Sequence, residues 1–269
     1  MTVRPLWFFW GQETMTFLRW VTVLSARQMH GDVRMVLRKD PIKSEVRWGF
    51  EKQDFQYENP GYIDRAGYLQ KFEEKGIRVS WLNELCPEIE RMGMPDVQTS
   101  DLIAWWLLAN EGGTVADMDI VFLKPLPRVD APVKVVRFAG YPRVGYVPVT
   151  FMQGTPCKTW SEIYDRAVIA CCPKRYESAG SGNVPIDLPG VLSDYVVFPW
   201  ARLASSGMWR RWLFGSKEWP AIPDDCVGIH WYAGGNQQWN QSITGPETLP
   251  LGAMGWAVKG VLDREGERS

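Results

Sequence analysis

The sequence predicts an α/β fold that opens with a strand, a helix and a second strand of Rossmann type. The dense apolar run Val3–Trp10 is stopped by Gly11, as is typical of a strand buried in a parallel sheet. A helical period follows over Thr14–Met29, and Val33–Leu37 forms a second short apolar run. This βαβ order places a binding crevice at the carboxyl ends of the two strands.

The next part of the chain has one irregular segment, one strand and one strongly predicted helix. Residues 41–75 are polar with no clean period, so we expect an insertion that ends in a helix around Asp64–Lys75. Ile77–Leu82 indicates another strand. Asp101–Glu111 indicates a buried helix, with Ser100 as its cap and Asp101 suited to its positive end.

Beyond Pro125 the pattern changes to short strands with proline and glycine breaks. One helix is expected near Trp160–Ala170, followed by a loop-rich C-terminal part and a frayed end over Asp263–Ser269. There is no internal repeat. A length of 269 residues favours one domain with insertions.

The composition is that of an ordinary globular protein, with 45% apolar and 23% charged residues, which excludes a disordered or collagen-like chain. Five cysteines without a C-x-x-C spacing fit neither a disulfide framework nor a zinc ribbon. The apolar patch Pro5–Trp10 is too short for a signal peptide or a membrane span, so we expect a cytoplasmic protein. Only two histidines, His30 and His230, are present, so metal chemistry must fall mostly to carboxylates.

The stretch that carries chemistry is Ser100–Leu126. Within it, Asp117 and Asp119 follow a buried helix, a glycine pair and an apolar strand, and precede the apolar run Ile120–Leu123. Two carboxylates between such runs need a cation or hydrogen bonds to compensate their burial. In an extended segment both face the same side, which makes half of a site for Mg²⁺ or Mn²⁺ and a phosphate ligand. The sequence contains neither a G-x-G-x-x-G fingerprint nor a Walker loop, which are the other common phosphate-binding motifs.

This stretch resembles the DXD region of nucleotide-sugar glycosyltransferases of the GT-A fold. The closest group contains initiating α-mannosyltransferases, lactosylceramide α-galactosyltransferases and large glucosylating toxins. The resemblance rests on Ser100-Asp101, Gly112-Gly113, Asp117-x-Asp119 and Leu123-Lys124-Pro125-Leu126. It implies a GT-A-like, Rossmann-type mixed sheet flanked by helices, with a loop-rich C-terminal part. One domain would span 1–269, with a nucleotide-sugar half at 1–126, an acceptor and closing half at 127–262, and a tail at 263–269.

The resemblance also implies an activity, which is metal-dependent transfer of a sugar from a nucleoside diphosphate sugar, with a UDP-sugar favoured, to an acceptor hydroxyl with retention. Mn²⁺ or Mg²⁺ would be the cofactor, and Asp117, Asp119 and His230 its ligands and the catalytic groups. Asp117 would also contact ribose and sugar. The implied donor contacts are Trp10, Gly11, Asp101, Gly113, Asn236 and Trp239.

Several of these assignments have a structural alternative. Trp10 either stacks on the nucleobase or packs in the core, and His230 either closes over the diphosphate or is an ordinary core histidine. Ala104 and Val115 stand where the family has Arg and Tyr, so the identity of the sugar does not carry over.

The acceptor is indicated by charge and aromatic residues. Residues 131–219 hold 11 Lys/Arg against 6 Asp/Glu, a balance of +5, and Trp200–Trp219 interleaves Trp with Arg. A glycan hydroxyl is the first candidate acceptor and DNA with hydroxymethylated bases is the second. An amphipathic helix with buried Trp, a carbohydrate-binding module without catalysis and a nucleotidyltransferase are the alternatives. The candidate acceptor contacts are Asp187, Asp194, Trp209, Arg210, Arg211 and Trp212.

Overall fold

The computed structural model describes residues 4–43, 62–136, 147–185, 188, 190–192, 196–198, 207–215, 222–234 and 236–266. In this part of the chain a seven-stranded sheet of order β10-β8-β9-β6-β1-β3-β5 forms the centre. The four strands β6, β1, β3 and β5 run parallel, whereas β9 is antiparallel to both β6 and β8. The strands are β1 (Leu6–Trp10), β3 (Val33–Leu37), β5 (Arg78–Trp81), β6 (Gly113–Ala116), β8 (Val133–Val136), β9 (Phe151–Gly154) and β10 (Val191–Leu192).

Two smaller sheets complete the described strands. β2 (Thr14–Thr16) pairs with β4 (Tyr62–Asp64), and β7 (Ile120–Phe122) pairs with β12 (Gly228–His230), which also pairs with β11 (Val197–Phe198). The mixed α/β fold and the βαβ opening β1-α1-β3 are therefore confirmed. The first helix begins at Phe17 instead of Thr14, because Thr14–Thr16 extends to pair with β4.

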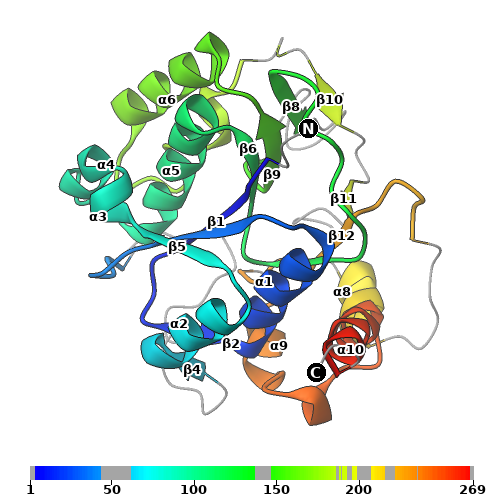
Figure 1. Cartoon of the computed structure of the whole chain (residues 1–269). Coiled ribbons are helices and arrows are strands. Elements are labelled where there is room, and N and C mark those ends of the chain that lie inside the picture. The colour runs from blue at the N-terminus through cyan, green and yellow to red at the C-terminus, as the bar shows by residue number, and fades with distance from the viewer. Residues whose placement is uncertain are drawn as a thin grey trace.

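Helices cover both faces of the central sheet, as Figure 1 shows. The helices α5 and α6 pack together on one face, whereas α1, α8 and α10 pack on the other. Side chains of β1 alternate between the two cores, since Leu6 and Phe8 belong to one and Trp7 to the other. The helices are α1 (Phe17–Met29), α2 (Arg65–Glu74), α3 (Leu82–Leu85), α4 (Pro87–Arg91), α5 (Asp96–Asn110), α6 (Lys158–Ala170), α8 (Gly207–Phe214), α9 (Gln237–Ser242) and α10 (Ala253–Gly266). None of them combines the length and the apolar run that a membrane span needs.

Helix α5 begins one turn earlier than the sequence predicts. Pro95 holds the N-cap position with extended ψ, so Ser100 is not a cap and Asp101 lies in the second turn. The first turn carries buried polar residues, which hide the apolar period. Gln98 donates a hydrogen bond to the Arg175 carbonyl at 3.0 Å, which compensates the burial of its amide nitrogen.

The C-terminal part contains a helix that the sequence pattern did not reveal. α10 continues to Gly266 and packs on α1 and α8. The prediction that the chain frays from Asp263 onward is therefore wrong for residues 263–266, which are helical. Arg264 donates to the Gln28 side chain at 2.9 Å, which attaches the last helical turn to α1.

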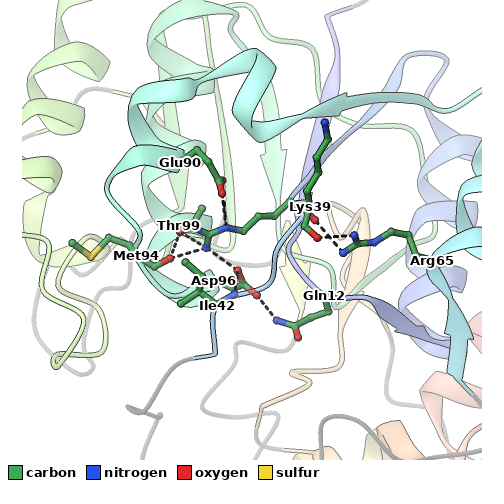
Figure 2. A network of polar contacts seen from close by, with 9 residues as sticks. Gln12, Lys39, Ile42, Arg65, Glu90, Met94, Asp96 and Thr99 are labelled. Atoms are coloured by element: carbon green, nitrogen blue, oxygen red, sulfur yellow. Dashed lines mark hydrogen bonds and ion pairs between the residues drawn. The ribbon is translucent and has the colours of Figure 1, made fainter.

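A buried ionic network fixes the turn that follows β1 (Figure 2). The Arg38 side chain, at the end of β3, is fully buried and pairs with Asp96 at 3.0 Å and with Glu90 at 3.3 Å. The Asp96 carboxylate also accepts a hydrogen bond from Gln12. A Cβ on Gly11 would lie 2.4 Å from the Asp96 Cγ, so only glycine lets the turn approach this carboxylate.

Replacing Arg38 by Met is expected to destabilise the fold strongly, because it leaves the Asp96 carboxylate buried without its cation. The expected loss is about 3–5 kcal/mol of unfolding free energy. The control is Arg34→Met, which breaks the partly exposed pair of Arg34 and Asp32 at 2.9 Å and should cost at most about 1 kcal/mol. Equal and small losses in urea denaturation would contradict the assigned role of the network.

Candidate active site

The two acidic residues of the DXD stretch occupy the turn between β6 and β7. The Asp117 N–H donates to the Thr150 carbonyl at 2.9 Å, which continues the pairing of β6 with β9 beyond the end of the strand. Asp117 remains partly exposed, whereas Asp119 is 7% exposed. Both carboxylates therefore lie at the carboxyl end of β6.

His230 reaches the same place from a distant part of the chain. Strand β12 pairs antiparallel with β7, and its register sets His230 opposite Ile120, next to Asp119. The His230 Nε2 lies 3.2 Å from the Asp119 Oδ1. Ligand atoms of Asp117, Asp119 and His230 all lie within 4.8 Å of one another.

Backbone donors hold Asp119 in this position. The Ala233 N–H donates to the Asp119 Oδ2 at 2.8 Å, and the Trp231 N–H donates to the Asp119 carbonyl at 3.0 Å. Tyr232, between these two residues, has a positive φ of 48°, which is uncommon for a bulky residue. The segment after β12 thus adopts a strained backbone that brings its N–H groups to Asp119.

The electrostatics of the site separate the two acids. Burial and the charge of Asp119 raise the pKa of Asp117 to about 6. Burial also acts to raise the pKa of Asp119, but the charge and proximity of His230 outweigh it and lower that pKa to about 2. Burial acts to lower the pKa of His230, but the charge and proximity of Asp119 outweigh it and raise that pKa. Without a cation the site therefore holds one acid that resists ionisation.

The donor set fits a divalent cation. The Asp119 Oδ1 and both ring nitrogens of His230 are buried and have no hydrogen bond of normal geometry, a situation that proteins avoid unless a ligand is bound. Two carboxylates and one imidazole are ligands that Mn²⁺ accepts, and Mg²⁺ would rely mainly on the carboxylates.

A third acid, Asp101 of α5, lies within electrostatic range of Asp117. Its Oδ2 would lie 2.7 Å from a Cβ on Gly180, so the loop after α6 approaches it closely. Burial, and then the charges of Asp117 and Glu177, raise the pKa of Asp101 well above its ordinary range. Glu177 also has a positive φ, of 42°. Sequence patterns did not indicate Glu177, because no local period shows where the loop after α6 folds.

Arg19 is a second residue that the sequence pattern did not indicate. It lies in the first turn of α1, with its guanidinium carbon 4.7 Å from the Trp10 ring centroid and 5.7 Å from that of Trp231. Trp10, predicted to bind the donor, is partly buried at the end of β1, and its Nε1 donates to the Thr14 carbonyl at 3.2 Å.

The segment that follows β12 is held by contacts among its own residues and with α8. Asn236 is 1% exposed, and its Nδ2 donates to the Trp231 carbonyl at 2.9 Å, while its Oδ1 accepts from the Arg210 Nε at 3.0 Å. The Trp239 ring stacks on Phe214 with centroids 5.0 Å apart. Both residues therefore support the segment after β12.

The structure separates Gly113 from the site. Gly113 begins β6, at the opposite end of the strand from Asp117. Its φ is +113°, and a Cβ there would lie 2.3 Å from the Pro5 carbonyl oxygen. Gly113 thus makes a close turn after α5, at the end of β6 that is remote from Asp117.

The predicted acceptor residues fall into three groups. Trp212 is 6% exposed and belongs to the core, which agrees with the amphipathic alternative for this helix. Arg211 is exposed, whereas Arg210 contacts Asn236. Asp187, Asp194 and the side chain of Trp209 lie outside the described residues.

Comparisons with known proteins bear on the fold. No protein-family model matches the sequence, and no curated protein matches it. Among solved structures, the glycosyltransferase GlyE of Streptococcus pneumoniae is similar over 98% of this chain and 64% of its own, with 12% identity and a TM-score of 0.50. Its apo form matches with 10% identity over the same shares and a TM-score of 0.49.

A further solved structure, the PaToxG glycosyltransferase, matches over 67% of this chain and 65% of its own, with 13% identity and a TM-score of 0.47. The chain therefore spans slightly less than two thirds of the length of these neighbours. At 12% identity the GlyE match shows that the fold is shared.

Replacing Asp117 by Asn is expected to stabilise the metal-free protein at pH 8 by a few degrees in Tm. The raised pKa of Asp117 means that its ionisation destabilises the fold as pH rises from roughly 4 through 6, and Asn removes that loss. The same variant should lose most of the stabilisation that Mn²⁺ gives to the wild type. Thermal melts at pH 5 and pH 8, with and without Mn²⁺, measure both effects. A variant that is less stable than wild type at pH 8, or that Mn²⁺ stabilises as much as it stabilises the wild type, would refute the assignment of Asp117 as a metal ligand.

Proposed function

We propose that this protein is a metal-dependent glycosyltransferase, which moves a sugar from a nucleoside diphosphate sugar to an acceptor hydroxyl. The observation that carries the proposal is the convergence of Asp117, Asp119 and His230, whose ligand atoms lie within 4.8 Å of one another. The fold that the chain shares with the glycosyltransferase GlyE supports it. So does the resemblance of Ser100–Leu126 to the DXD region.

In this proposal each residue around the cluster has a separate role. Asp117, Asp119 and His230 hold Mn²⁺ or Mg²⁺, which supplies positive charge at the departing diphosphate. Asp119 is kept in place by the Ala233 N–H, so the site is organised before the donor binds. Burial and the nearby acids raise the pKa of Asp101, which favours the protonated carboxyl, and we assign it a hydrogen bond to a sugar hydroxyl of the donor. Trp10 offers its ring to the nucleobase.

A UDP-sugar is the donor that we favour, and retention at the anomeric carbon is part of the proposal through the DXD resemblance. The acceptor that we propose is a glycan hydroxyl. DNA has less support than the charge balance of residues 131–219 implies, because Trp212 is buried and Arg210 braces Asn236. Arg211 remains as an exposed cation of that helix.

The direct test is a thermal-shift screen of nucleoside diphosphates and nucleotide sugars, with and without Mn²⁺. A ligand at a hundred times its Kd stabilises the folded state by about 2.7 kcal/mol, so the true donor should raise the Tm by several degrees only when Mn²⁺ is present. Stabilisation by glycans alone would indicate a carbohydrate-binding module. Release of pyrophosphate from a nucleoside triphosphate would indicate a nucleotidyltransferase.

Replacing Asp119 by Asn should reduce Mn²⁺-dependent donor hydrolysis by roughly a hundredfold or more, since a ligand of the cation is weakened. The amide oxygen can still accept the Ala233 N–H, so the fold should persist, as circular dichroism would show. Asp263→Asn is the matched control, because Asp263 is an exposed acid that pairs only with Lys259 at 2.6 Å among the described contacts. Hydrolysis at the native rate by purified Asp119→Asn would remove the metal site from the mechanism.

A further inference from the structure

Arg19 is a cation within electrostatic range of the acidic cluster, by which we mean Asp117, Asp119 and His230. The Arg19 guanidinium is between two tryptophan rings, at 4.7 Å from the centroid of Trp10 and 5.7 Å from that of Trp231. Trp10 ends β1, and Trp231 follows His230 at the end of β12. Arg19 therefore connects the predicted nucleotide crevice with the segment that carries His230.

The position of Arg19 is set by contacts on both sides. The Thr16 Oγ1 accepts the Arg19 backbone N–H at 3.4 Å and donates to the Asn240 Oδ1 at 2.7 Å, which attaches the start of α1 to α9. Trp10 is held in turn by its hydrogen bond to the Thr14 carbonyl. Cation–π stacking uses the faces of a guanidinium plane, and the N–H donors lie along its edge. A guanidinium can therefore contact a tryptophan ring with its face and still offer N–H donors along its edge.

The charge of Arg19 acts on the cluster. The charge of Arg19 acts to lower the pKa of Asp119 and, against the net rise, that of Asp117, so the three groups are within electrostatic range. With both acids ionised and His230 neutral, these groups and Arg19 sum to a charge of −1. A divalent cation on the carboxylates changes the sum to +1. An anion bound to that cation also meets the positive charge of Arg19, and a diphosphate is an anion that can bridge a cation and an arginine.

We propose that Arg19 binds the diphosphate of the donor and stabilises it as the leaving group. The inference rests on the proposed function, and it adds a residue that the DXD resemblance does not supply. The alternative is that Arg19 only supports the Trp10 and Trp231 rings. The two roles differ in what they predict for a ligand without phosphate, because support of Trp10 affects the nucleoside as well.

The test compares UDP with uridine by calorimetry at saturating Mn²⁺, for wild type, Arg19→Met and Arg19→Lys. If the screen above favours another base, its nucleoside diphosphate and nucleoside replace them. Arg19→Met should bind UDP at least about tenfold more weakly, since a charged hydrogen bond is lost, and should bind uridine within about twofold of wild type. Arg19→Lys keeps the charge and should recover part of the UDP affinity. Where Arg19→Met does not fold, Arg19→Gln replaces it.

The matched control is Arg34→Met. Arg34 makes the same kind of contact, with its guanidinium carbon 4.9 Å from the Trp7 ring centroid, but Trp7 belongs to the other core. This control should bind UDP as the wild type does. Unchanged UDP affinity in Arg19→Met, or an equal loss for UDP and uridine, would overturn the inference while the proposed function stands. A wild type that binds no nucleoside diphosphate with Mn²⁺ would overturn the proposed function, and this inference with it.

Discussion

The site depends on the antiparallel pairing of β7 with β12. Asp117 and Asp119 are close in sequence, but His230 joins them only because the register sets it opposite Ile120. The same pairing lets the residues after β12 direct the Trp231 and Ala233 N–H groups to Asp119. A shift of this register by one residue would turn His230 to the opposite face and remove the cluster. The remaining strands and helices keep these two short strands in place.

Around this pairing the structure contains features that reduce the stability of the fold, namely acids near one another and residues with positive φ. Asp117 and Asp101 have raised pKa values because both are partly removed from solvent and lie near other acids. Of the described non-glycine residues, Glu177 and Tyr232 have positive φ; Tyr232 lies between the two residues whose N–H groups hold Asp119, and the charge of Glu177 acts on Asp101. Strained backbone and mutually repelling carboxylates are common where a protein binds a cation and a charged substrate. By contrast, the buried Arg38 network has its acids paired, and it stabilises the adjacent turn.

Local patterns were sufficient to predict much of the fold and the acidic half of the site. The apolar run of β1, the helical period of α1 and the burial of Asp117 and Asp119 between apolar segments are all properties of neighbouring residues. The predicted start of α5 was wrong because the first turn of this helix buries polar side chains. Gly113 is close to Asp117 in sequence but lies at the other end of β6, because a strand separates the residues at its two ends. Arg19 comes within electrostatic range of Asp117 and Asp119, and Glu177 within that of Asp101, through tertiary packing, which a single sequence does not encode in any local period.

The central claim is that Asp117, Asp119 and His230 form a cation site that also binds a diphosphate. Pulsed electron paramagnetic resonance of the Mn²⁺-loaded protein tests it most directly, because it detects the nuclei that contact the metal. We expect a coupled imidazole nitrogen that disappears in His230→Gln, and coupled phosphorus nuclei that appear when UDP or the nucleoside diphosphate preferred in the screen is added. Bound Mn²⁺ that shows water protons alone, with neither nitrogen nor phosphorus coupling, would contradict this cation site.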